Sequence, residues 1–209
     1  MKRILFLLLL IMGRPVLAQE IEFYDTDGKR LSKKEFLRKS DSRYNLALSF
    51  QTGKTTVSRL VKRDKVGRMS PDSLRVLRTH LGKATGSDIP GEQYIIVNYH
   101  PGIDPCNTGG ASDRTFLNNK FRAYLTKVQA LKNFSQAFIY ASNEGLEKYA
   151  GIINWFPDQG NVIQRTFFNY HYPCGSFVII SPDGRYYSYY GEYSHDQVLR
   201  HAKTMAGQP

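Results

Sequence analysis

A hairpin followed by a capped helix near the C-terminus constrains the fold more than any other feature of the sequence. Phe177–Tyr190 reads FVIISPDGRYYSYY, so two β-rich runs are joined by Pro182-Asp183-Gly184. Proline fixes φ for the turn, aspartate can bond its own backbone, and glycine accepts a positive φ. Ser194 and Gln197 have the spacing of a helix cap. The chain is therefore predicted to finish as strand, turn, strand and helix.

Alternating strands and helices are predicted before this hairpin. Tyr94–Tyr99 (YIIVNY) and Ala137–Ala141 (AFIYA) are nearly continuous apolar runs, typical of strands covered on both faces. Helical spacing of apolar residues follows each run, first at Leu117, Phe121, Tyr124, Leu125, Val128 and Leu131, and then at Leu146, Tyr149, Ala150 and Ile153. Right-handed crossovers make these two strands parallel, and the hairpin adds an antiparallel pair. The predicted order is βαβα followed by ββα, an α/β fold over residues 91–209.

Residues 19–90 predict a smaller N-terminal extension of strands and helices. Ser32 and Glu35 have the spacing of a capping box, and Asn45–Gln51 and Thr55–Val61 can pair across a turn at Gly53. Ser70-Pro71 predicts the start of another helix. Gly82–Gly91 contains glycine, proline and serine, so the boundary of the main domain is placed there.

The first 18 residues predict a signal peptide of bacterial type. Lys2 and Arg3 precede the apolar run Ile4–Met12, and cleavage is expected after Ala18. The apolar run is far shorter than the roughly 20 residues of a membrane-spanning helix. We therefore expect a mature protein, Gln19–Pro209, that is periplasmic or secreted and has no transmembrane segment.

The basic residues are concentrated in one region. Removal of the signal peptide leaves 26 basic against 18 acidic residues. Gly53–Lys83 contains nine of the basic residues, namely Lys54, Arg59, Lys62, Arg63, Lys65, Arg68, Arg75, Arg78 and Lys83. Such a cluster is usually a solvated face, and the alternative is weak contact with an anionic surface such as lipid headgroups. Nucleic acid is not an expected partner, because the sequence contains no nucleic-acid-binding motif.

Gly91–Ala206 resembles the thioredoxin-like superfamily, particularly exported bacterial thioredoxin-like reductases. The resemblance rests on the YIIVNY strand, the loop with Cys106, the Tyr172-Pro173 dipeptide, the FVIISPDG segment and the capped last helix. It implies a thioredoxin-like sandwich. In this family a CxxC motif follows the first strand at a helix N-terminus, and a cis-proline faces the two cysteines.

Two positions depart from the family pattern. Where the CxxC motif falls by counting from the strand, this chain has Asp104-Pro105-Cys106-Asn107, with Asp104 in place of the attacking cysteine. Pro173, the counterpart of the cis-proline, lies eight residues before Ser181, about two more than is usual in the family. A carboxylate cannot perform thiol exchange, so Asp104 argues against ordinary oxidoreductase activity, and it can instead cap the following turn.

The resemblance places Cys106 and Cys174 on two loops that meet at one end of the sheet. A disulfide there needs a Cα separation of roughly 5.5 Å. As a structural bridge it would contribute about 4 kcal/mol, in a protein that binds an unknown protein or peptide partner. As a redox pair, Cys106 would be the attacking thiolate, Cys174 the resolving partner and Pro173 part of the substrate groove. The sequence favours the structural bridge because it lacks a CxxC pair. It does not decide whether the protein is also a thiol-disulfide oxidoreductase.

A metal site is the third alternative. His100 and His171 are near the cysteines in sequence, and Cys106, Cys174, His100 and His171 together form a ligand set that suits copper or zinc. Copper carriers of the superfamily instead have both cysteines in one short motif, so a resident cofactor is not expected. His80, His195 and His201 are predicted to lie on helix surfaces.

Overall fold

The computed structural model describes residues 21–107 and 113–208. The predicted signal peptide lies outside the described residues. The chain forms two compact units, which are described separately. The smaller contains the described residues up to Ser40 together with Ala47–Val61, and the larger contains Asp41–Leu46 and Lys62–Pro209.

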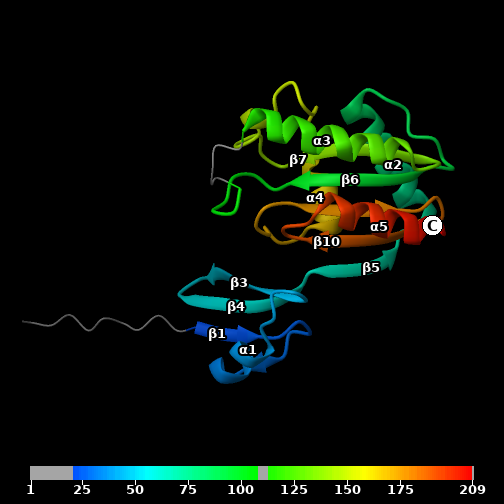
Figure 1. Cartoon of the computed structure of the whole chain (residues 1–209). Coiled ribbons are helices and arrows are strands. Elements are labelled where there is room, and N and C mark those ends of the chain that lie inside the picture. Colours follow the sequence, from blue (N-terminus) through cyan, green and yellow to red (C-terminus); the bar gives the residue numbers. More distant parts are fainter. Residues whose placement is uncertain (1–20, 108–112, 209) are drawn as a thin grey trace, which may run out of the picture. The chain divides into compact units, whose positions relative to one another are not determined.

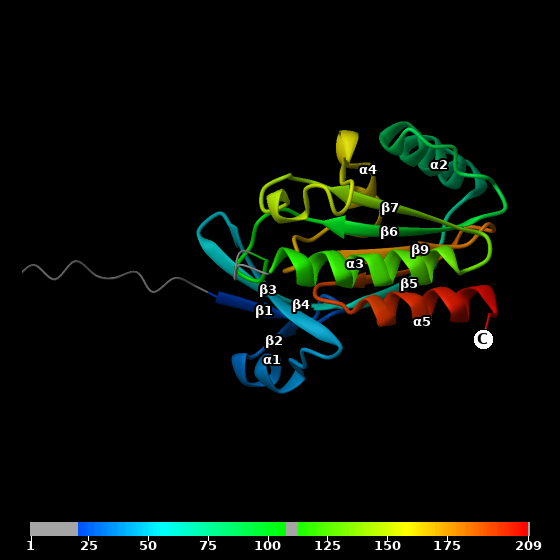
Figure 2. The ribbon, with the colours of Figure 1, turned by 45° about the horizontal axis from the view of Figure 1, so that its top comes forward.

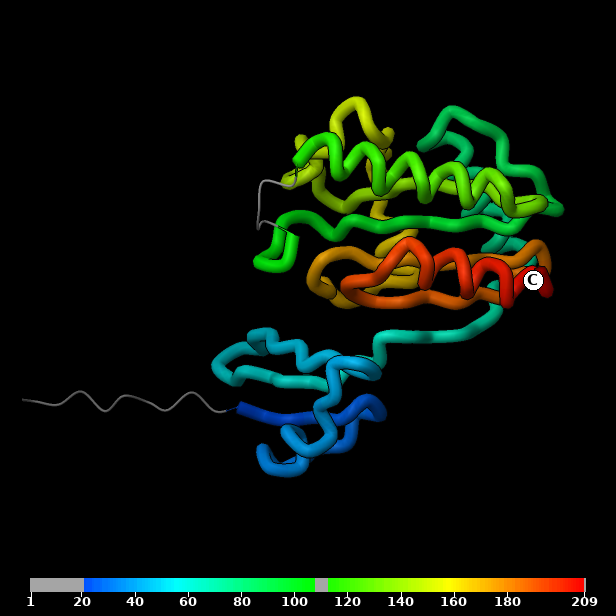
Figure 3. Tube along the Cα trace, in the orientation of Figure 1, coloured from blue at the N-terminus to red at the C-terminus, as the bar shows by residue number. Residues whose placement is uncertain are grey.

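The smaller unit is built on a sheet with the strand order β2-β1-β4-β3. Its elements are β1 (Ile21–Tyr24), β2 (Arg30–Leu31), α1 (Lys33–Lys39), β3 (Asn45–Thr52) and β4 (Thr55–Lys62). The first two residues of β3 and the last residue of β4 are assigned to the larger unit. The predicted capping box begins α1, since Ser32 and Glu35 bond each other's backbone N–H groups. A small core of Leu31, Phe36 and Leu60 stabilises this unit, which is drawn in blue and cyan in Figure 3.

The larger unit has a six-stranded sheet with the order β5-β10-β9-β6-β7-β8. These strands are β5 (Asp64–Arg68), β6 (Tyr94–His100), β7 (Phe134–Tyr140), β8 (Phe156–Pro157), β9 (Ser176–Ile180) and β10 (Arg185–Tyr190). Strand β6 is parallel to β7 and antiparallel to β9, so Val97 is opposite both Ala137 and Val178. Strand β9 is antiparallel to β10. The arrangement β7-β6-β9-β10 is the thioredoxin-like topology, which confirms the predicted fold.

Helices cover both faces of this sheet. They are α2 (Pro71–Thr85), α3 (Arg114–Gln129), α4 (Val162–Phe167) and α5 (His195–Ala206). Helices α3 and α5 lie on one face, with α2 and α4 on the other (Figures 1 and 2). The apolar stripe of α3 packs against Val198, Leu199 and Ala202 of α5, which explains why the spacing in the sequence predicted both helices. None of the helices that the structure describes is long and apolar enough to span a membrane.

The helix predicted after the second strand is wrong in position and length. Only a 3₁₀ turn, Glu147–Tyr149, forms there, and α4 follows later. Gly145 and Gly151 enclose this turn with φ values of 80° and 71°. A left-handed residue at each end leaves no room for a longer α-helix, although the apolar spacing between them is helical.

The division of the chain also differs from the boundary predicted near Gly91. Strand β5 pairs with β10, where Val66 is opposite Tyr187, and α2 packs near α4 and β8. Both elements therefore belong to the larger unit. The segment DKVGR of β5 is an edge strand with mostly exposed residues, so its sequence lacks the apolar run that identifies the buried strands.

Candidate functional site

The two cysteines meet at the end of the sheet where β6 finishes. Cys106 is in the loop after β6 and Cys174 is in the loop before β9, and their Cα atoms are 5.1 Å apart in a disulfide. Cys106 is exposed and Cys174 is partly buried. The predicted pairing is confirmed. Because β6 and β9 are neighbours in the sheet, residues 68 positions apart in sequence reach one another.

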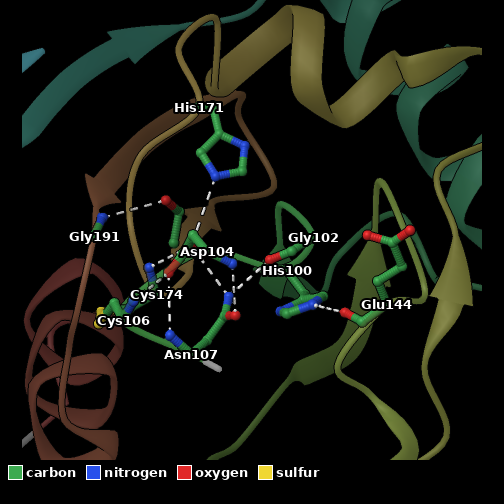
Figure 4. A network of polar contacts seen from close by, with 10 residues as sticks. His100, Gly102, Asp104, Cys106, Asn107, Glu144, His171, Cys174 and Gly191 are labelled. Carbon is green, nitrogen blue, oxygen red and sulfur yellow. Dashed lines mark hydrogen bonds and ion pairs between the residues drawn. A yellow bond between two sulfur atoms is a disulfide. The ribbon is translucent and has the colours of Figure 1, made fainter. Parts of the chain in front are cut away.

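Asp104 connects the two cysteine loops (Figure 4). Its Oδ1 accepts hydrogen bonds from the backbone N–H groups of Cys106 (2.8 Å) and Asn107 (3.1 Å), and its Oδ2 accepts from the backbone N–H of Cys174 (3.0 Å). The Asn107 side chain donates to the same carboxylate at 3.1 Å and accepts from the Asp104 backbone N–H. Asp104 is 8% exposed, so these bonds lie in a medium where they are strong. Asp104 therefore caps the turn that follows it, as predicted, and also holds the loop that contains Cys174.

The backbone of Cys174 has an unusual conformation. Its φ is 76°, in the left-handed region that few residues other than glycine adopt. This conformation directs the Cys174 N–H toward Asp104, so the hydrogen bond and the disulfide both hold it. The preceding Tyr172–Pro173 peptide bond is trans, in contrast to the cis-proline of the resembled family.

The two predicted metal-binding histidines do not join the cysteines. The His100 side chain is directed toward Glu144, whose carbonyl oxygen lies 2.9 Å from its Nε2 (Figure 4). Burial lowers the pKa of His100, so its neutral form is favoured. His171 is exposed, and its Nε2 is 3.6 Å from Oδ2 of Asp104. The structure therefore does not bring His100, His171 and the two sulfurs together as one ligand set, since His100 lies against the Glu144 carbonyl and His171 against Asp104.

Glu192 is the group that does lie beside the sulfurs. Among the described residues, Cys106, Cys174 and Glu192 form a set whose ligand atoms are all within 4.8 Å of one another. Glu192 follows β10 and is exposed. Sequence reasoning missed it, as it missed Asn107, because no local pattern indicates that the β10–α5 connection reaches the cysteine loops.

The predicted basic region includes residues of both units. Lys54 and Arg59 belong to the smaller unit, whereas the remaining seven residues belong to the larger. Several of the latter have local partners. Arg63 donates to the carbonyl oxygens of Tyr190 and Glu192, and Arg78 to those of Pro90 and Gln93. These two guanidinium groups therefore hold loops of the larger unit.

Comparisons with known proteins found few similarities. No protein-family model matches the chain, and no curated protein matches it. Among solved structures, a secreted Mycobacterium tuberculosis disulfide oxidoreductase homologous to E. coli DsbE is similar, with 14% sequence identity and a TM-score of 0.35. The match covers 56% of this chain and 84% of that chain.

Proposed function

We propose that this chain is an exported thioredoxin-like protein whose Cys106–Cys174 disulfide is a structural cross-link. The bridge would fix the two loops at the end of the sheet as a binding surface for a protein or peptide partner. One observation carries the proposal. The Asp104 carboxylate stands where the resembled enzymes have their attacking cysteine, and it bonds the backbone N–H groups of both cysteines.

This arrangement favours the disulfide over the dithiol. The Asp104 hydrogen bonds do not depend on the sulfur atoms, so they keep the two thiols close together after reduction. A high effective concentration of one thiol at the other lowers the reduction potential of the pair. This effect supports a bridge that resists reduction.

The same end of the sheet exposes apolar side chains to a partner. Ile103, in the loop with Cys106, is 48% exposed, and Phe116, in the first turn of α3, is 60% exposed. Large apolar side chains on a fixed loop and on a helix end supply the contact area that a protein or peptide partner needs. The disulfide and the Asp104 bonds reduce the entropy that the cysteine loop would lose on binding.

The reduction potential tests the proposal. The mature protein is equilibrated in dithiothreitol redox buffers, and the free thiols are counted by alkylation and mass mapping. We expect a potential below about −300 mV and no turnover with insulin or a dithiol-coupled substrate. A potential near or above about −270 mV together with turnover would replace the structural function with a catalytic one.

A thiol–disulfide oxidoreductase is the second candidate, and the exposure of Cys106 favours it. The Cys106 thiolate would attack a substrate disulfide to form a mixed disulfide, and the Cys174 thiolate would then displace the reduced substrate. Cys174→Ser would trap the mixed disulfide at Cys106.

The proposal that the protein is exported rests on residues 1–18 of the sequence. N-terminal sequencing of the protein recovered from the periplasm or medium should begin at Gln19. Recovery of the full-length chain from the cytoplasm would contradict export.

Contact of the basic region with an anionic surface is also a proposal. Sedimentation with anionic vesicles, compared with neutral ones, tests whether the basic residues bind a lipid surface.

A further inference from the structure

We propose that the reduced form of this site binds Zn²⁺ through Cys106, Cys174 and Glu192. The inference goes beyond the proposed function, because it concerns the dithiol state whereas the cross-link is the disulfide state. Two thiolates and one carboxylate are a ligand set that zinc accepts, and soft thiolates select zinc over magnesium or calcium.

The distances suit a tetrahedral ion after reduction. The two sulfur atoms and one oxygen of Glu192 lie within 4.8 Å of one another. Zinc binds thiolate at about 2.3 Å and carboxylate at about 2.0–2.2 Å, so tetrahedral ligand atoms are separated by about 3.5–3.8 Å. Breaking the S–S bond lets the sulfurs move apart to this distance. Because Cys106 and Glu192 are exposed, the fourth position is open to water.

Glu192 is held beside the sulfurs by its neighbours. Gly191 has a φ of 81°, and a Cβ there would lie 2.8 Å from the ring of Tyr172, so only glycine fits. Its N–H donates to Oγ of Ser176, and Arg63 donates to the carbonyl oxygen of Glu192 at 2.8 Å. In the part of the chain that the structure describes, no hydrogen bond or ion pair engages the Glu192 carboxylate. It is therefore available as a ligand.

Asp104 keeps the other two ligands in place. Its carboxylate bonds the backbone N–H groups of Cys106 and Cys174, and these bonds do not involve the sulfur atoms. The three ligands come from three loops, after β6, before β9 and after β10. Zinc would thus replace the disulfide as the link between the first two loops, and it would also connect them to the loop after β10.

The reaction balances with an external phosphine reductant. The phosphine is oxidised to the phosphine oxide with oxygen from water, and the disulfide takes up two electrons and two protons to give two thiols. Binding of Zn²⁺ then releases both thiol protons. The affinity should consequently increase with pH.

The test is an anaerobic titration of the mature protein after reduction and removal of the phosphine. Zn²⁺ is divided between the protein and a chromophoric chelator, and Cd²⁺ reports thiolate binding through its charge-transfer absorption. We expect the reduced wild type to bind one ion per chain. Glu192→Gln should bind Zn²⁺ at least about tenfold more weakly, whereas the controls Glu92→Gln and His171→Gln should keep the wild-type affinity. Circular dichroism verifies that each variant is folded.

Two results would overturn the zinc site. One is equal affinity in Glu192→Gln and the reduced wild type. The other is binding by the reduced wild type no tighter than that of the Cys106→Ser/Cys174→Ser variant. Both are measured on protein already reduced, so they are independent of the reduction potential that tests the cross-link.

Discussion

The carboxylate of Asp104 lies 3.0 Å from the backbone nitrogen of Cys174, a residue 70 positions later in the chain. The same carboxylate bonds the backbone of Cys106, so it holds both partners of the disulfide. A hydrogen-bond acceptor in the first cysteine loop therefore reaches the backbone of both cysteines. The acceptor and the disulfide fasten the same two loops.

Asp104→Asn should destabilise the protein even while the disulfide is intact. Asparagine keeps one acceptor oxygen but replaces the other with an amino group, which meets an N–H donor. Loss of charge-assisted bonds at a buried site costs about 1–3 kcal/mol of unfolding free energy. Urea denaturation of the oxidised protein measures it. Asp88→Asn, at an exposed position, is the matched control, and equal losses in the two variants would contradict the clamp.

Glycine should be better than serine at position 174 when the bridge is absent. The φ of 76° strains any residue with a Cβ by about 1 kcal/mol or more. In a Cys106→Ser background, we expect Cys174→Gly to unfold at higher urea concentration than Cys174→Ser, with a difference of about 1 kcal/mol. A serine variant as stable as the glycine variant would show that the loop relaxes once the disulfide is removed.

Gly191→Ala should be strongly destabilising because it combines a positive φ with a collision. The added Cβ would lie 2.8 Å from the Tyr172 ring. Gly207→Ala is the control, since Gly207 has a φ of 63° and no heavy atom within 4 Å of an added Cβ. We expect a loss of about 1 kcal/mol for Gly207→Ala and about 2 kcal/mol more for Gly191→Ala. Similar midpoints in thermal denaturation would argue against close packing at Gly191.

His195 should make the protein less stable in acid. Burial, assisted by the charge of Lys120, lowers the pKa of His195 to about 4, whereas it is about 6.5 in the unfolded chain. Between these values the unfolded state binds more protons, so the free energy of unfolding falls as pH decreases from about 6.5 to about 4. His195 is partly exposed, so we expect this contribution to be about 2 kcal/mol at most.

The comparison with His195→Gln isolates this effect. The wild type should lose more stability between about pH 7.5 and pH 4.5 than the variant does, whatever the variant's stability at neutral pH. Urea denaturation at both pH values gives the difference. Parallel losses in the two proteins would assign the acid sensitivity to other groups, such as His100.

Much of the fold follows from patterns that the sequence carries locally. The apolar run Tyr94–Tyr99, the turn at Pro182–Gly184 and the caps at Ser32, Ser70 and Ser194 all depend on neighbouring residues, and each forms its element where it was predicted. His195 shows where this reasoning fails. It was predicted on a helix surface, but its ring stacks on Tyr124 with a centroid separation of 3.9 Å, a contact that α3 provides.

The sequence alone determined the strands β6, β7, β9 and β10 and the helices α3 and α5 of the thioredoxin-like unit, and the resemblance that followed led to the pairing of the only two cysteines. Tertiary structure decided what surrounds that pair. Asp104, Cys174 and Glu192 come from three loops that neighbouring strands bring to one end of the sheet, and no periodicity along the chain encodes such a meeting. Local patterns report backbone preference and burial, which act over a few residues. The chemistry of the site depends on distances in space, which only the folded sheet establishes.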